Sequence, residues 1–362
     1  MNFEIRKIRL NELYDFVNSK IYRQFLTIPI TGLRANSYIN NPHSQPDDVV
    51  VYLGFIQNQL VAFRTLFADC IKCEDENVRF AWCSGNWVHP DFRRKGFSEL
   101  LLNEAFIDWN GKLMFTNYAP HSEKLYLKSG NFHAVHQFNG FRGYLFPKAL
   151  KLIQVANKNW FTKALFSIVD LGISVISSAR LWFFSEKQNP DFRFKTAQYP
   201  DEDCYKITQN NTTKCLFNRG EEEFKWIFLF PWISDNEAYK SVNYPFSSYS
   251  NSFYYKTLKV FVQNKLVGFF IFSVREGHLK TLHFNIPEGI EKEVATYLKQ
   301  FCAKHKIEVL TVYKYELAQQ LFAQKFPFLH AKKFGQKVYS SFEIKDIDNY
   351  VFQDGDGDVI FT

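Results

Sequence analysis

The sequence predicts an α/β fold, an α+β arrangement of mixed sheets flanked by helices, built as two domains. In the first half, strand-like runs come first, and strands and helices then alternate, which is typical of a mixed sheet with flanking helices. The second half repeats this order. The length of 362 residues also suits two globular domains better than one.

The composition is that of a globular protein. Hydrophobic residues make up 46% and charged residues 22%, which excludes a disordered or low-complexity chain. The net charge of +7 is too diffuse to indicate a nucleic-acid partner. The 40 Phe and 19 Tyr residues favour sheet-rich cores or apolar grooves, because aromatic side chains suit half-buried pleated surfaces.

The N-terminal residues carry charges and no apolar run typical of a signal peptide, so a cytoplasmic protein is expected. The most apolar stretch, residues 163–184, is interrupted by Asp170 and Arg180, so no transmembrane segment is expected. Six sparse cysteines indicate reduced thiols rather than a disulfide framework. Cys70 and Cys73 alone cannot supply the four ligands of a zinc site, so no metal is expected.

The elements of the first half follow from residue types and their periodicity. We expect, in order, a strand at 3–8, a helix at 11–25, strands at 50–57, 60–73 and 78–88, a helix from 97, a strand at 113–117, a helix at 122–129 and a strand at 132–146. Asn58 and Gln59 are expected to form a two-residue hairpin turn. Residues 147–199 then form a helical connector whose amphipathic helix either packs on the domains or lies on a membrane surface.

A nine-residue segment recurs in the second half. Residues 55–63 (FIQNQLVAF) and 261–269 (FVQNKLVGF) share Phe, Gln, Asn, Leu, Val and Phe at matching places, which suggests two copies of one fold. The repeat is followed by expected strands at 278–285, 307–312 and 332–342 and helices at 290–305 and 316–324. The expected division is a first domain at 1–146, the connector at 147–199 and a second domain at 200–362.

A basic loop separates the strand ending at Val88 from the helix that is expected to begin at Phe97. It consists of Arg93, Arg94, Lys95 and Gly96. Unpaired N–H groups at a helix N-terminus bind phosphate, glycine permits close backbone approach, and the cations add charge. The loop therefore predicts an anion site for a phosphorylated cofactor, although its spacing is neither that of a nucleoside triphosphatase loop nor that of a dinucleotide fingerprint.

Residues 87–102 (WVHPDFRRKGFSELLL) resemble motif A of the GNAT superfamily, the acyl-CoA N-acyltransferases, whose pattern is (Gln/Arg)-x-x-Gly-x-(Gly/Ala). Arg93, Gly96 and Ser98 occupy its three positions, with Ser98 in place of the usual Gly or Ala. Residues 122–132 (SEKLYLKSGNF) resemble motif B, in which a Leu-Tyr pair precedes a glycine by four residues. The two motifs have the family's order and separation, and the resemblance covers residues 2–146.

The resemblance implies two GNAT-like domains, each a mostly antiparallel mixed sheet with a splayed pair of parallel strands. It implies that the backbone of Trp87 and Val88 pairs with the pantetheine arm of acyl-CoA, and that the loop from Arg94 to Ser98 binds the pyrophosphate. The other implied cofactor contacts are Phe97, Asn117 and Ser122. Acetyl-CoA or another acyl-CoA is the implied cosubstrate.

Tyr126 matches the position that protonates the departing CoA thiolate in many members, and the other interpretation is a buried helix tyrosine. Many members also place a basic carboxylate on the strand before motif A. Residues 79–87 contain no Asp or Glu, so the base comes from elsewhere or is dispensable. His121 is one candidate for the base, and an ordinary loop histidine is the alternative.

The second copy lacks both the basic loop and the tyrosine. Residues 287–289 (PEG) replace the basic loop, and Phe322 stands where the first copy has Tyr126. It resembles a degenerate GNAT domain that walls off the acceptor groove or binds the acceptor, with the aromatic side chains of Trp226, Phe230 and Trp232 as contacts or as core residues. Residues 354–358 (DGDGD) are expected to form an exposed acidic loop near the acceptor site, not a calcium loop, because no closing Glu follows.

The function expected from the sequence is acyl-CoA-dependent transfer of an acyl group to the amine of a small molecule or amino sugar. Two alternatives remain open. A relative of the aminoacyl-tRNA-dependent peptidoglycan-bridge transferases would also pair two such domains, but the intact phosphate loop favours CoA. A noncatalytic acyl-CoA-binding module would account for the missing carboxylate.

Overall fold

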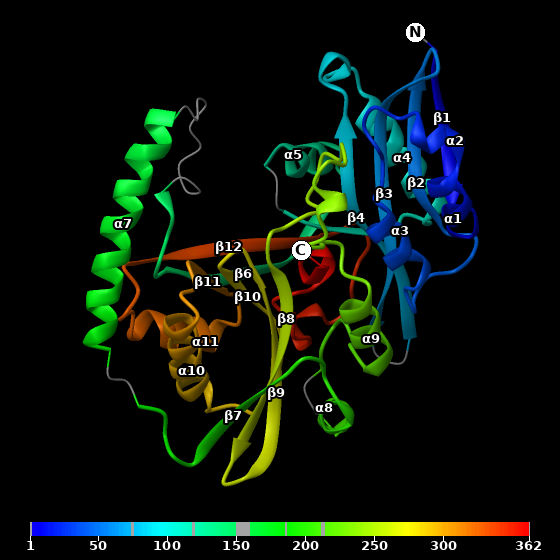
Figure 1. Cartoon of the computed structure of the whole chain (residues 1–362). Coiled ribbons are helices and arrows are strands. Elements are labelled where there is room, and N and C mark those ends of the chain that lie inside the picture. The colour runs from blue at the N-terminus through cyan, green and yellow to red at the C-terminus, as the bar shows by residue number, and fades with distance from the viewer. Residues whose placement is uncertain are drawn as a thin grey trace. The chain divides into compact units, whose positions relative to one another are not determined.

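The computed structural model describes residues 2–73, 76–117, 120–149, 160–184, 187–210 and 214–361 (Figure 1). The chain divides into two compact units, neither of which is contiguous in sequence. Unit 1 comprises residues 1–137, 208–253 and 336–362, and unit 2 comprises residues 138–207 and 254–335. This division differs from the contiguous one expected from the sequence (1–146, 147–199 and 200–362).

Unit 1 contains one mixed sheet and the helices that cover it. Its strands are β1 (Phe3–Arg9), β2 (Val49–Ile56), β3 (Gln59–Cys73), β4 (Glu76–Val88), β5 (Leu113–Thr116) and the end of β12 (His330–Ser340). Its α-helices are α1 (Leu10–Asn18), α2 (Lys20–Arg23), α3 (Gly32–Ile39), α4 (Phe97–Asp108), α5 (Pro120–Lys128), α9 (Glu221–Leu229) and the end of α8 (Glu202–Asn210). Its short 3₁₀ helices are η1 (Pro90–Phe92), η2 (Glu237–Tyr239), η3 (Ile347–Asn349) and η4 (Gly357–Phe361).

The sheet of unit 1 has the strand order β1-β2-β3-β4-β5-β12. All its neighbours are antiparallel except β4 and β5, which run parallel. β2 lies inside the sheet, and its eight residues, VVVYLGFI, are all buried. A nearly continuous apolar run of this kind suits a strand that is covered on both faces. On one face, α4 packs Leu101, Leu102 and Ala105 against the sheet in an apolar core.

Unit 2 repeats this plan. Its strands are β7 (Phe192–Ala197), β8 (Phe253–Val262), β9 (Lys265–Arg275), β10 (His278–Asn285), β11 (Val309–Val312) and the end of β6 (His133–Tyr144), in the order β6-β11-β10-β9-β8-β7. Its helices include α7 (Trp160–Trp182), α10 (Glu291–Lys304) and α11 (Tyr315–Ala323). Here β10 and β11 form the parallel pair.

The two hairpins of the repeated segment have the same turn. Gln57 and Asn58 have φ of 48° and 64°, and Gln263 and Asn264 have φ of 47° and 67°. Two consecutive residues with positive φ are typical of the type I′ turn that matches strand twist. The predicted hairpin is confirmed, but its turn residues are Gln57 and Asn58, one position earlier than expected.

The last strand of each sheet comes from the other half of the sequence. In unit 1, β5 pairs with Val338–Ser340 of β12. In unit 2, β11 pairs with Phe141–Tyr144 of β6. β6 and β12 are thus exchanged between the two sheets, and each unit contains a strand from the other half of the sequence. Strands can pair in this way because backbone hydrogen bonds do not depend on how far apart two strands are in the sequence.

The connector forms α7, of which Ala164–Trp182 is long and apolar enough by length and composition to cross a membrane. Asp170 and Arg180 therefore do not by themselves exclude such a role. Residues 192–197, expected to be polar connector, form β7 on β8.

Candidate active site

The parallel strands β4 and β5 diverge in unit 1. They pair only through Ala81 with Leu113 and Trp82 with Met114. Beyond this point β4 continues to Val88, hydrogen-bonded to β3, and Ser84 is an extra residue between the pairs Leu66–Cys83 and Thr65–Gly85. This β-bulge bends β4 where the two strands separate. An open strand edge at such a divergence can pair with an extended ligand.

Trp87 and Val88 end β4 and point to opposite faces of the sheet. Val88 packs against the core under α4. Trp87 stacks on Phe63 on the other face, with ring centroids 5.3 Å apart. Their expected pairing with a pantetheine arm involves only backbone groups and stays a prediction.

The basic loop lies at the N-terminus of α4, and Arg93, Arg94, Lys95 and Gly96 are all exposed. Gly96 caps the helix with φ of 81°, a conformation that strains residues with a side chain, and an added Cβ would meet no atom within 4 Å. The loop therefore faces open space and leaves the first N–H groups of α4 without intrahelical acceptors. This geometry fits a phosphate group.

The cations of this loop differ in their contacts. Arg93 donates from Nε to the carbonyl oxygen of Val88 at 3.3 Å. The Lys95 ammonium lies 4.8 Å from the ring centroid of Phe92. Phe97 anchors the start of the helix, because its ring stacks on Phe3 with centroids 4.3 Å apart.

Tyr126 extends from α5 into the core of unit 1 and accepts a hydrogen bond of 2.7 Å from Nη1 of Arg64, a fully buried residue of β3. Its ring stacks on Phe115 of β5, with centroids 4.2 Å apart. A guanidinium can only donate hydrogen bonds. The proton of the Tyr126 hydroxyl is therefore directed away from Arg64 and can be donated to another group.

Arg64 also connects Tyr126 to the basic loop. Its Nη2 lies 3.3 Å from the carbonyl oxygen of Ser98 in the first turn of α4. The Ser98 hydroxyl donates to Oδ1 of Asn86 at 2.6 Å, and Nη2 of Arg64 lies 3.4 Å from that same oxygen. Ser98 is thus more than a small residue at a glycine position, because its hydroxyl ties α4 to β4.

Burial raises the pKa of the Tyr126 hydroxyl, and the Arg64 guanidinium opposes that rise. Burial likewise raises the pKa of the Cys83 thiol, which lies beside both residues, so Cys83 is a neutral thiol. The site therefore presents a protonated phenol next to a fixed positive charge. Nε of Arg64 is buried and has no hydrogen-bond partner among the described residues.

The other predicted residues are placed as follows. Asn117 follows β5 and pairs with Lys337, whose N–H donates to Oδ1 of Asn117 at 2.6 Å, so its side chain holds β12. His121 and Ser122 lie in α5, and their side chains fall outside the described part of the chain. Among the residues that the structure describes, no cluster of His, Cys, Asp and Glu is arranged to hold a metal ion.

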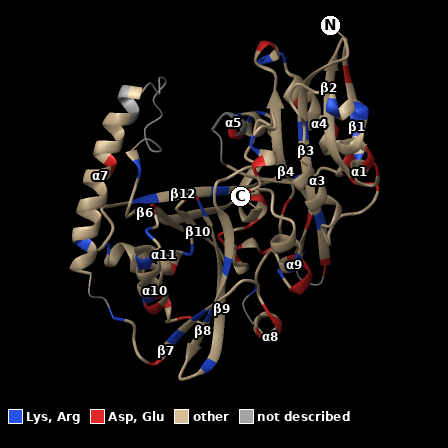
Figure 2. Cartoon of the chain, in the orientation of Figure 1, with Lys and Arg blue, Asp and Glu red and all other residues tan. Residues whose placement is uncertain are grey.

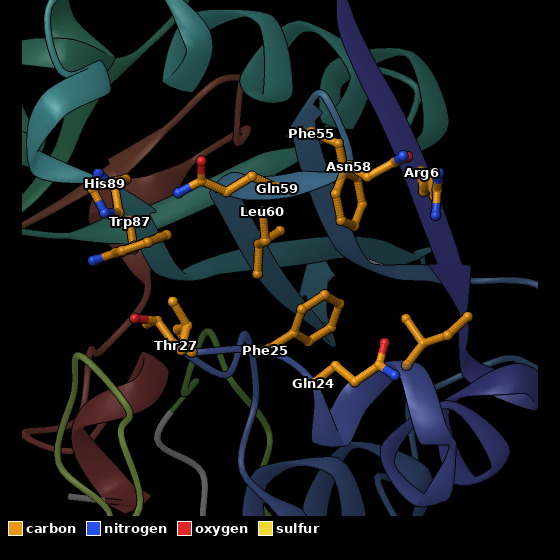
Figure 3. A pocket seen from close by; sticks show the side chains of 12 residues that line it. Arg6, Gln24, Phe25, Thr27, Phe55, Asn58, Gln59, Leu60, Trp87 and His89 are labelled. Atoms are coloured by element: carbon orange, nitrogen blue, oxygen red, sulfur yellow. The ribbon is translucent and has the colours of Figure 1, made fainter.

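A pocket of about 400 Å³ lies beside the end of β4, on the face that Trp87 shares with Phe63 (Figure 3). Phe25, Phe55 and Leu60 give it an apolar lining, and Arg6 lies at the end opposite Trp87 and His89 (Figure 3). Trp226 and Trp232, considered above as acceptor contacts, are almost fully buried in unit 1.

The acidic tail corrects one expectation. Asp354 and Asp356 are 2% and 4% exposed, so residues 354–358 are not an exposed loop. The tail packs on the sheet of unit 1 through η4, where Asp358 accepts a hydrogen bond of 3.2 Å from the Thr116 hydroxyl. The sequence analysis did not identify Arg64 as the partner of Tyr126 or Asp358 as the partner of Thr116. An arginine inside the apolar run of β3 was a signal that could have pointed to Arg64.

The corresponding place in unit 2 has different chemistry. The N–H of Gly289 donates to the Glu291 carboxylate at 2.9 Å, which places a negative charge at the start of α10. Phe322, in the place of Tyr126, packs against Phe141 with centroids 5.0 Å apart.

No protein-family model and no curated protein matches the sequence. A solved structure from Enterococcus faecalis V583, described as a conserved protein of unknown function and probable N-acyltransferase, has a TM-score of 0.50 at 11% identity and covers 96% of this chain and 74% of its own. A GCN5-related N-acetyltransferase from Anabaena variabilis has a TM-score of 0.49 at 10% identity, covering 94% and 72%. A tandem GNAT protein from the clavulanic acid biosynthesis pathway has a TM-score of 0.49 at 9% identity, covering 94% and 99%. The likeness to the Enterococcus faecalis structure is a likeness of fold. The mixed α/β fold class expected from the sequence is confirmed by the strands and helices of the two units.

Proposed function

We propose that this chain is an acyl-CoA-dependent N-acyltransferase that transfers an acyl group, in the first instance acetyl, directly to the amine of a small molecule or amino sugar. The observation that carries the proposal is the pair Arg64–Tyr126 beside diverging strands and a basic helix N-terminus. A phosphate site, an open strand edge and a proton donor are three of the things that thioester aminolysis with CoA requires of a protein.

In this mechanism the loop from Arg94 to Ser98 binds the pyrophosphate of acyl-CoA, and the edge of β4 at Trp87 and Val88 holds its pantetheine arm. The amine attacks the thioester carbonyl, and the carbon–sulfur bond breaks. Tyr126 gives its proton to the departing thiolate, and Arg64 stabilises the phenolate that remains. The protein acts in the cytoplasm.

The pocket beside Trp87 supports an acceptor with an apolar part. Its aromatic lining suits a hydrocarbon or ring, while Arg6 and Gln24 offer polar contacts at one end. The amine would then lie toward the end of β4, near the diverging strands.

Binding and catalysis can be tested separately. Saturating acetyl-CoA should raise the melting temperature of the purified protein, because a ligand that binds the folded state stabilises it. Thiol release from acetyl-CoA should then appear with at least one member of a panel of amino sugars, amino acids and polyamines. Absence of acetyl-CoA binding would contradict the proposal. Binding without thiol release across the panel would favour the noncatalytic module.

A further inference from the structure

The mechanism still needs a group that removes the proton of the attacking ammonium. The strand before the basic loop has no carboxylate, but the C-terminal tail brings one to the same place. Gly357, next to Asp358, lies so close to the sheet that an added Cβ would be 3.3 Å from Thr116 and 3.4 Å from the Trp82 ring. Asp358 is therefore held where β4 and β5 begin to diverge.

Asp358 and Tyr126 lie on opposite faces of these strands. Phe115 stacks on Tyr126, and the next residue of β5, Thr116, points to the other face and donates to Asp358. On β4 the same alternation places Cys83 on the Tyr126 side and Trp82 on the Asp358 side. The Cys83 thiol interacts electrostatically with Arg64 and Tyr126 and also with Asp358, so these groups surround one short stretch of β4.

Two buried polar groups on the Asp358 face lack hydrogen-bond partners among the described residues. They are the hydroxyl of Tyr244 and Nε of Arg34. Arg34 donates from Nη1 to the hydroxyl of Ser84, the bulge residue of β4, at 2.9 Å. Burial raises the pKa values of Tyr38 and Tyr244, and the negative charge of Asp358 contributes to this rise, so both hydroxyls lie near its carboxylate. Buried polar groups are normally bonded, so such a group marks a place for the polar atoms of a ligand.

Building on the proposed function, we propose that Asp358 is the general base of the reaction, and that the amine acceptor approaches from its face of the sheet, opposite Tyr126. The ammonium gives one proton to the Asp358 carboxylate, and the nitrogen lone pair forms the amide bond as the carbon–sulfur bond breaks. The nitrogen then releases its second proton to solvent. Tyr126 protonates the thiolate, and solvent returns the proton from Asp358 to Tyr126. Arg34 and Tyr244 bind the polar groups of the acceptor.

The test compares Asp358→Asn with Asp348→Asn, an exposed aspartate of the same tail. Two classes of nucleophile are used with acetyl-CoA. The panel amines are protonated at neutral pH and must lose a proton before they attack. Hydroxylamine is unprotonated at neutral pH, so it can attack without a general base. Asp358→Asn should lower kcat/KM for the amines about 10²–10⁴-fold and leave hydroxylamine transfer within about threefold. The Kd of acetyl-CoA and the melting temperature, measured on the same samples, should stay at the wild-type values.

Each other outcome has a distinct meaning. Wild-type rates with amines in Asp358→Asn would overturn the assignment of the base and leave the proposed function standing. An equal loss of kcat/KM with amines and with hydroxylamine would show that Asp358 has a structural role, and it would also overturn the assignment of the base. A wild-type protein that neither binds acetyl-CoA nor releases thiol would overturn the proposed function itself, and the base with it.

A second, independent observation concerns α7 in unit 2. Three of its polar residues are bonded to the body of unit 2: Asp170 accepts from the backbone N–H of Ala149 at 2.6 Å, Ser177 donates to the carbonyl of Leu145, and Arg180 donates to the carbonyls of Pro327 and Phe328 at 3.0 Å. Most of its apolar residues are exposed, and 6% of the window Ala164–Trp182 is buried. Figure 2 shows the helix almost free of charged residues.

The exposed face of α7 has the features of a helix that lies in a lipid interface. Its apolar members include Leu165, Ile168, Leu171, Val175 and Ile176. Trp160 and Trp182, 80% and 84% exposed, stand at its two ends, and tryptophan favours the level of lipid headgroups. The segment that leads into and opens the helix carries Lys151, Lys158 and Lys163, which suits an anionic surface.

We infer that α7 docks this protein on an anionic lipid bilayer, with its axis parallel to the surface. A parallel orientation follows because Asp170, Ser177 and Arg180 are bonded to the body of unit 2, and a spanning orientation would break those bonds. The apolar face then enters the boundary between headgroups and acyl chains. This inference does not depend on the proposed enzymatic function.

Vesicles of phosphatidylglycerol and phosphatidylcholine test the inference by cosedimentation of the full chain. Binding is expected to anionic vesicles, and Ile168→Glu with Leu171→Glu should weaken it about tenfold or more. The matched control is Ile107→Glu, which alters an exposed isoleucine of α4, 67% exposed, and should bind like wild type. A wild-type protein that stays in the supernatant would overturn the inference. So would a dimer that the α7 variant disperses without any vesicle binding, since the face would then cover a second copy.

Discussion

Arg64 donates a hydrogen bond of 2.7 Å to the hydroxyl of Tyr126, so a fully buried guanidinium on β3 orients the proton of a phenol on α5. Tyr126→Phe should lower kcat about 10²–10⁴-fold, because the proton donor is lost while the ring still fills its place. The Kd of acetyl-CoA, measured by calorimetry, should remain within about twofold of wild type, since the hydroxyl adds little to ground-state binding.

Arg64 acts through Tyr126, so it is a positioning residue. Arg64→Lys keeps the positive charge but loses the two-nitrogen contact to Tyr126 and Ser98. A lower kcat with an altered alkaline limb of the pH–rate profile is expected, because the Tyr126 pKa would lose the lowering that comes from the Arg64 hydrogen bond while the positive charge remains. An unchanged profile would mean that Arg64 only packs the core.

Gly96→Ala should weaken acetyl-CoA binding about tenfold, because φ of 81° is strained for alanine and the loop must move. Gly111→Ala is the matched control. Gly111 has φ of 73°, and an added Cβ there also meets no atom within 4 Å. Both variants should lose similar stability in urea denaturation, about 1–2 kcal/mol, but only Gly96→Ala should raise the Kd. Equal Kd values would show that the loop does not contact the cofactor.

The buried ion pair of Asp69 and Arg219 anchors residues 208–253 in unit 1. Its two hydrogen bonds measure 3.1 and 2.7 Å, and the Trp82 indole donates to the same carboxylate at 2.8 Å. Burial alone would raise the pKa of Asp69, but Arg219 and His43 together hold it below its ordinary value. Arg219→Ala should reduce the free energy of unfolding by about 3–5 kcal/mol, since it leaves a buried charge unpaired.

The control for this pair is Lys225→Ala, which removes an exposed partner of Glu221 on α9. It should cost only about 0.3–0.5 kcal/mol in the same denaturation experiment. Comparable losses in the two variants would contradict the anchoring role of Arg219.

Burial raises the pKa of Asp356 to about 8, against the opposing influence of Arg219. The folded protein therefore holds this proton up to about pH 8, whereas the unfolded chain releases it near the ordinary pKa of 3.8. The folded state binds more protons between these values, so the contribution of this group to stability falls as the pH rises from about 4 to about 8. Asp356→Asn should remove this dependence of stability on pH.

The measurement is the melting temperature from pH 5 to pH 9. Asp356→Asn should be more stable than wild type at pH 8, and the difference should shrink toward pH 5. The exposed Asp348→Asn should follow the wild-type curve throughout. Parallel curves for Asp356→Asn and wild type would contradict the raised pKa.

The sequence by itself determined the order of strands and helices, the duplicated hairpin and the basic turn before α4. These depend on local signals: the period of apolar residues, two consecutive left-handed positions at Gln57 and Asn58, and a glycine at a helix start. α3 was missed, because it is only eight residues long and contains Gly32 and Asn36, which are weak helix formers.

Only the tertiary structure decided which residues share the site. The exchange of β6 and β12 and the packing of the C-terminal tail depend on contacts between residues far apart in the chain. Thr116 and Asp358 are 242 positions apart, and no local periodicity links them. The carboxylate that we propose as the base lies in a tail that the sequence had indicated as an exposed loop. The hydrogen-bond partner of Tyr126 is a buried arginine 62 residues before it. Local preferences follow from neighbouring residues, whereas an active site is assembled by the burial of distant ones.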